Sequence, residues 1–140
     1  MVHHRWDCCQ KRINGAEVWL DNYKCGEIEY HRGVTMYPIN CGGRAGRIVK
    51  VKQPHDFLHL AEVQVFGTGG EGGSVPNYGT GNVKLLSYEK HATMSSTHGR
   101  YAAYLAVDGK EDYGRFRYEN TLEFTYLFSM KMIVINSLHN

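Results

Sequence analysis

A short run near the start of the chain combines two guanidinium groups, a carboxylate and two adjacent thiols. Arg5 and Arg12 flank the pair Cys8 and Cys9, and Asp7 lies between the first arginine and that pair. Adjacent cysteines can close a small, rigid disulfide ring with an apolar sulfur face. Asp7 can orient one guanidinium, and each guanidinium offers a fork of N–H donors. An apolar plate between two such donors suits a ligand with one apolar patch and several hydroxyls, such as the deoxy sugar fucose.

Zinc is the alternative ligand for the same two cysteines. Together with His3 and His4 they offer the imidazole and thiolate groups that zinc prefers. Structural zinc sites usually place a few residues between two cysteines so that both sulfurs converge, and adjacent cysteines lack this spacing. The spacing therefore favours the disulfide over zinc. We expect the two histidines to end a strand, with one of them in solvent.

Alternating polar and apolar residues predict that β-strands position these groups. Residues 16–21 (AEVWLD) and 49–52 (VKVK) alternate in this way. In residues 58–66 apolar side chains occupy both phases, which predicts that both faces are partly buried there, as in a strand of a sandwich. At 140 residues the chain has room for one domain with its own core.

The composition argues against several classes of partner. The formal net charge is only +2 and there is no basic tract, so we expect no nucleic-acid partner. The apolar stretch 124–135 is too short to cross a bilayer, so we expect no membrane span. Four cysteines, an even number, are compatible with an oxidising compartment. No apolar segment precedes the motif, so a secreted protein would have its true start further upstream.

Residues 5–12 (RWDCCQKR) resemble the R-x-D-C-C-x-x-R/K signature of the F-type lectins, or fucolectins, and the resemblance continues through residues 12–18, 46–51 and 58–67. It implies an all-β fold, an antiparallel β-sandwich of jelly-roll type related to galactose-binding and discoidin-like modules. It also implies the residue roles that follow. The sugar would be bound by Arg5, Asp7, Cys8, Cys9 and Arg12, and the disulfides would join Cys8 to Cys9 and Cys25 to Cys41.

The order of the segments is unusual for that family. Residues 82–85 (NVKL), 92–97 (ATMSST) and 105–109 (LAVDG) resemble the opening of such a domain, although they come later in this chain. The resemblance thus divides the chain into the C-terminal half of one lectin domain at 1–67, a glycine-rich linker at 68–81, and the N-terminal half of a lectin domain at 82–140 that is degenerate after Asp112. A cut through a tandem array and a circular permutation both produce this order, and the sequence leaves both open. The permutation would let the two halves close into one sandwich.

A calcium site is the other implication of the resemblance. Glu62, beside Ala61 where the family has a cysteine, and Asp108 match acidic ligands of the family. Leu105 and Lys110 would contribute main-chain carbonyl oxygens. Calcium takes oxygen ligands of these kinds. A carboxylate within an apolar strand is also costly unless it is paired or bound to a metal.

The chain departs from the family in one part of the binding motif. The family uses a histidine that precedes the first arginine, and the equivalent loop here, residues 113–118 (YGRFRY), has none. We predict non-catalytic recognition of fucosylated glycans in an extracellular, secreted protein of innate immunity, often directed at microbial surfaces. The alternative is a structural or protein-interaction sandwich that has lost sugar binding. Self-association as a homo-oligomer is left open.

An enzyme is not expected. Ser95, Ser96 and Thr97 precede His98, but neighbouring residues on a strand point to opposite faces, so a nucleophile and its base would not meet. Residues 111–112 (ED) form a carboxylate pair that follows a turn, where both side chains would be solvated. A glycosidase would need two carboxylates that face one cleft.

Overall fold

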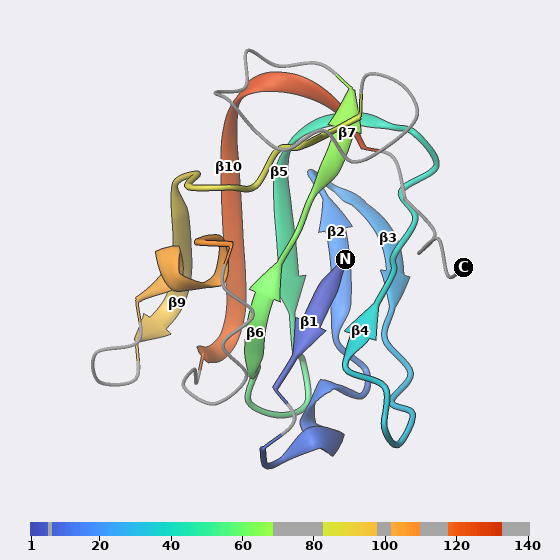
Figure 1. Cartoon of the computed structure of the whole chain (residues 1–140), viewed down its shortest axis with the longest axis vertical. Helices are drawn as coiled ribbons and strands as arrows, with labels where there is room; N and C mark the ends of the chain where they lie inside the picture. Colours follow the sequence, from blue (N-terminus) through green and yellow to red (C-terminus); the bar gives the residue numbers. More distant parts are fainter. Residues whose placement is uncertain (6, 69–82, 98–101, 110–117, 133–140) are drawn as a thin grey trace.

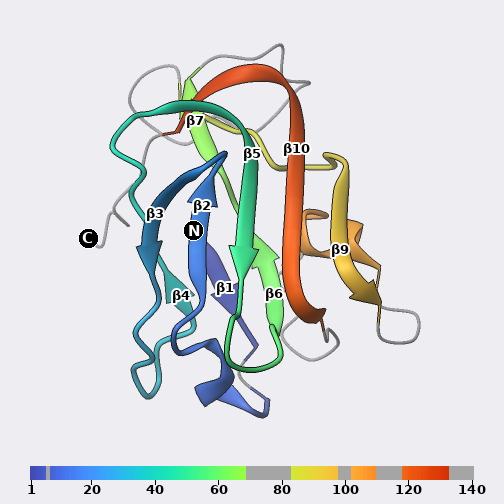
Figure 2. The ribbon, with the colours of Figure 1, turned by 180° about the vertical axis from the view of Figure 1, so that it is seen from behind.

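The chain folds into two antiparallel β-sheets that pack face to face, as the front and rear views of the ribbon show (Figures 1 and 2). The computed structural model describes residues 1–5, 7–68, 83–97, 102–109 and 118–132. No helix in these ranges is long and apolar enough to cross a membrane, since the two helices are single 3₁₀ turns. The predicted all-β antiparallel sandwich is confirmed.

The smaller sheet has three strands in the order β4 (Met36–Tyr37), β1 (Val2–His4) and β6 (Leu60–Val63). The larger sheet has seven strands. Its main path runs through β3 (Tyr23–Glu27), β2 (Glu17–Leu20), β5 (Ala45–Lys52), β10 (Tyr118–Met132), β7 (Phe66–Thr68) and β8 (Lys84–Leu85), and β9 (Ala92–Thr97) pairs with β10. The two 3₁₀ turns are η1 (Gln10–Ile13) and η2 (Ala103–Ala106).

The burial of the strands follows the predicted alternation. In β2, Val18 and Leu20 are buried, and Glu17 and Trp19, which alternate with them, are only partly buried. In β5, Val49 and Val51 are buried in the same way. All four residues of β6 are buried, which confirms that this strand is covered on both faces. Apolar side chains from both sheets therefore meet in one core.

The long strand β10 joins the two segments that the glycine-rich stretch separates. It pairs with β5, for example at Thr121 with Lys52, and it also pairs with β7, where Lys131 lies opposite Thr68. Figure 1 shows β10 rising beside β5 and then arching over the top of the sandwich to reach β7. Strands from both sides of the stretch thus share one sheet, as a closed arrangement requires. Of the predicted linker at 68–81, Thr68 belongs to β7, and residues 69–81 lie outside the described residues. The assignment of the two segments to halves of a lectin domain stays a prediction.

A disulfide joins Cys25 on β3 to Cys41, which is buried. The predicted pairing of these two cysteines is therefore confirmed. It closes a loop with a sequence separation of 16 residues. In the chain-entropy model a loop of this size stabilises the fold by about 3 kcal/mol.

Candidate functional site

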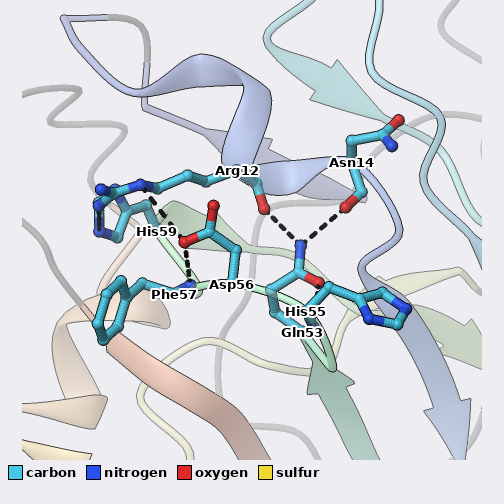
Figure 3. Close-up of polar contacts among 7 residues, drawn as sticks. All are labelled: Arg12, Asn14, Gln53, His55, Asp56, Phe57 and His59. Carbon is cyan, nitrogen blue, oxygen red and sulfur yellow. Dashed lines mark hydrogen bonds and ion pairs between the residues drawn. The ribbon is translucent and has the colours of Figure 1, made fainter.

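The turn η1 carries Arg12 and is fixed to the body of the protein by one buried side chain. Gln53, which is 2% exposed, donates from its Nε2 to the main-chain oxygens of Arg12 and Asn14, the latter at 2.9 Å (Figure 3). Carbonyls at the end of a helical turn have no partner within the turn. Gln53 supplies that partner, and the packing of the fully buried Ile13 holds the turn from the other side.

Arg5 follows β1 directly and is held by Asp7. Its Nε donates to Asp7 Oδ1 at 2.6 Å and its Nη2 donates to Oδ2, so the two planar groups form a bidentate pair. The hydrogen bonds from Arg5 lower the pKa of Asp7, and the same bonds raise the pKa of the arginine. Because the carboxyl pKa is lowered in the folded protein, the pair contributes to the free energy of unfolding at higher pH and loses this contribution only as the pH falls through the lowered pKa. The guanidinium is therefore oriented and charged at all ordinary pH values.

Arg12 is held by three residues of the loop between β5 and β6. Its Nε lies 3.5 Å from Asp56 Oδ1, its Nη1 lies 3.3 Å from His59 Nε2, and its Cζ lies 5.4 Å from the ring centroid of Phe57 (Figure 3). Arginine has donors but no acceptor, so His59 Nε2 must accept this hydrogen bond. The loop, which sequence analysis did not connect with the site, thus fixes the second guanidinium.

The adjacent cysteines lie between the two arginines in the sequence and directly precede η1. Cys8 is partly buried, and Cys9 is exposed and has a left-handed backbone with φ of 58°. With Arg12 and Tyr30 they line a shallow depression of about 500 Å³. A hydrogen bond with Cys9 raises the pKa of the Cys8 thiol, and desolvation raises it further. The structure has both residues as free thiols and not as the disulfide that we predict, so that bond stays a prediction.

We expect oxidised, folded protein to contain the Cys8–Cys9 bond in addition to Cys25–Cys41. Peptide mapping without reduction checks this, because a vicinal disulfide leaves both cysteines in one peptide that is lighter than its reduced form by two hydrogens and does not react with thiol-alkylating reagents. Cys25–Cys41 serves as the internal control, since the same digest must show it. Alkylation of both Cys8 and Cys9 in folded, oxidised protein would contradict the prediction.

The two histidines end strand β1, as predicted, but the prediction that one of them is in solvent was wrong. His3 is 1% exposed and His4 is 0% exposed, because both faces of β1 are covered. His3 Nε2 lies 3.0 Å from Gln64 Oε1, and His4 Nδ1 lies 3.2 Å from the main-chain oxygen of His59. Burial lowers the pKa of His4. The described residues contain no cluster of three or more His, Cys, Asp or Glu side chains suited to a metal, so nothing there assembles the zinc alternative.

The structure brings Glu62 to the turn at Asp108 and Gly109. Glu62 on β6 is 0% exposed, and its Oε1 accepts a hydrogen bond from Gly109 N at 3.3 Å, across 47 residues of sequence. Gly109 has a φ of +76°, in the left-handed region that favours glycine. The structure places two of the other three residues of the predicted calcium site. Leu105 lies in η2, just before this turn, and Ala61 lies beside Glu62 in the fully buried strand β6. Lys110 lies outside the described residues. A buried carboxylate beside a turn of main chain fits the oxygen ligands of calcium.

The chain is similar to one curated protein over part of its length. It is 37% identical over 76 residues to a pentraxin fusion protein of Xenopus laevis, and the match covers 46% of this chain and 18% of that protein. The chain therefore spans less than a fifth of the length of this relative. No family model matches the chain, and no solved structure matches it.

Proposed function

We propose that the chain is a non-catalytic carbohydrate-recognition module that binds fucosylated glycans through Arg5 and Arg12. The observation that carries this proposal is that both guanidiniums are held in place before any ligand arrives. Asp7 holds the first, and Asp56 with His59 holds the second. Donors that are already oriented lose little conformational freedom when they bind hydroxyl groups, which improves affinity for a small polar ligand.

The apolar part of the ligand would lie on Cys8 and Cys9. Fucose carries a methyl group where related sugars carry a hydroxymethyl group, and this methyl can rest on the sulfur atoms while the ring hydroxyls face the two arginines. Oxidation to the vicinal disulfide would make this surface rigid. The setting would be extracellular and the role one in innate immunity, and the Cys25–Cys41 disulfide is consistent with an oxidising compartment. The partial similarity to a pentraxin fusion protein supports a lectin-like module.

Calcium would stabilise this module without touching the sugar. Glu62 and Asp108 would supply carboxylate oxygens, and the main chain near Leu105 and Lys110 would supply carbonyl oxygens. The ion would join β6 of the smaller sheet to the segment that follows η2. The hydrogen bond between Gly109 and Glu62 supports the proposal, because it brings the two parts of the ligand set together.

A structural or protein-interaction role is the second candidate. The observation that favours it is the burial of Arg5, which is only 8% exposed and already pairs with Asp7. Such a pair can order the segment between β1 and η1 without any ligand. Of the loop at residues 113–118, which lacks the histidine of the F-type lectins, residues 113–117 lie outside the described residues and Tyr118 begins β10.

Affinity chromatography separates the two candidates. The full chain should be retained on immobilised L-fucose and eluted by free L-fucose, and D-glucose at the same concentration should not elute it. D-glucose has hydroxyls but no methyl, so it controls for general attraction to a polyol. Passage of folded protein through the column without retention would favour the structural role.

A further inference from the structure

We infer that a second hollow beside Arg12 is a subsite for the neutral sugar that follows fucose in a glycan. The hollow has a volume of about 560 Å³ and is lined by Glu17 and residues 52–57. The inference deepens the proposed function and rests on it. It concerns residues that the sequence motif does not include.

Two residues that line the hollow contact Arg12, so the hollow lies next to the Arg12 side chain. Gln53 lines it and donates to the main chain of Arg12, while Asp56 lines it and lies 3.5 Å from the Arg12 Nε. Figure 3 shows these side chains around the arginine, with the Phe57 ring beside its guanidinium. A sugar held by Arg12 would therefore have its neighbour close to residues 53–57.

Phe57 gives the hollow an apolar wall. The residue is 45% exposed, although its backbone is fixed by a hydrogen bond from Phe57 N to Asp56 Oδ1 at 2.7 Å. Ligand sites in proteins combine an apolar or aromatic wall with a few placed polar groups. The ring can pack against the C–H face of a sugar, and Asp56 and Glu17 can accept hydrogen bonds from its hydroxyls.

The charges of the hollow favour a neutral sugar. Asp56 lies beside Arg12, Glu17 Oε1 accepts from Lys24 Nζ at 2.6 Å, and the Lys52 Nζ lies 4.8 Å from the Trp19 ring centroid. A neutral sugar leaves these contacts intact. An acidic sugar would compete with Asp56 for Arg12 and would be repelled by both carboxylates.

Isothermal titration with two kinds of ligand tests the inference. We would measure the affinity of the full chain for methyl α-L-fucoside and for a set of neutral fucosylated tri- and tetrasaccharides, and take the ratio of the two. The best oligosaccharide should bind about tenfold more tightly than the monosaccharide, as expected for one added aromatic contact with hydrogen bonds. In Phe57→Ala this ratio should fall close to one.

Two variants serve as controls. Phe57→Tyr keeps the aromatic wall and should keep the ratio. Tyr23→Ala removes an equally exposed ring on β3, 44% exposed, and should also keep it. Circular dichroism melts would verify that each variant is folded. A sialylated fucosylated oligosaccharide should gain less affinity than its neutral counterpart.

The possible outcomes are distinct. A tenfold ratio that survives Phe57→Ala would overturn the subsite, and so would monosaccharide binding without any gain for a neutral oligosaccharide. An equal gain for the sialylated ligand would overturn its assignment to neutral sugars. Failure to bind methyl α-L-fucoside at all would overturn the proposed function and this inference with it.

Discussion

Replacing Arg5 with alanine is expected to abolish retention of the chain on immobilised fucose. The variant loses a forked donor that Asp7 holds in place through two hydrogen bonds. Hydrogen bonds that involve a charged group contribute about 1.5–3 kcal/mol each, so the loss of one or two corresponds to a decrease in affinity of about 100-fold. Titration of methyl α-L-fucoside into folded variant protein measures the effect.

Conservative and control variants show whether sugar binding depends on the forked geometry of the guanidinium or only on its positive charge. Arg5→Lys keeps the positive charge but cannot form the bidentate pair, so it should bind almost as weakly as alanine. Arg12→Ala should weaken binding by a similar factor, while Arg47→Ala, which removes an exposed arginine on β5, should have no effect. Unchanged affinity in both Arg5→Ala and Arg12→Ala would end the proposal of a sugar site here.

Calcium is expected to raise the melting temperature of the chain, and Glu62→Gln is expected to remove that response. A ligand that binds only the native state at 100 times its dissociation constant stabilises the protein by about 2.7 kcal/mol. For a domain of this size the increase in melting temperature would be about 8 °C. Glutamine has the shape of glutamate and keeps an oxygen for Gly109 N, so the substitution removes mainly the charge.

Thermal melts in calcium and in chelator check this expectation. Glu29→Gln, at an exposed glutamate, is the matched control and should respond to calcium as the unmodified chain does. Two results would count against the site: identical melts in calcium and chelator, or a Glu62→Gln variant that still responds.

Local pattern was sufficient for the parts of the fold that depend on neighbouring residues. The alternation in residues 16–21 and 49–52 predicted β2 and β5. The two apolar phases in residues 58–66 predicted partial burial of both faces there, and all four residues of β6 are in fact buried. The prediction that one histidine of β1 is in solvent was wrong. A strand of three residues is too short to show an alternation of polar and apolar side chains, so its burial could not be predicted. β1 pairs with β4 and β6, and both of its faces are covered by parts of the chain that are distant in sequence.

In the candidate site, too, contacts between residues close in sequence could be predicted and contacts between distant residues could not. Arg5, Asp7 and Arg12 lie within eight residues of sequence, so their association could be predicted, and the structure pairs Arg5 with Asp7. The partners of Arg12 could not be predicted. His59 lies 47 residues away and resembles an ordinary strand residue, and only the folded loop between β5 and β6 brings it to the guanidinium. The calcium ligands were suggested by the family resemblance and, for Glu62, by the cost of a carboxylate within an apolar strand.

The position of β10 affects how the chain is made as well as how it is held together. The ribosome synthesises β5 and β7 well before β10, yet β10 pairs with both of them. Until residues 118–132 emerge, the nascent chain has two strands whose edges on that side are unpaired, and unpaired edges are where other chains attach. Contacts between residues so distant in sequence also form slowly. A chaperone that shields strand edges during translation should therefore increase the yield of soluble protein more than one that acts after release.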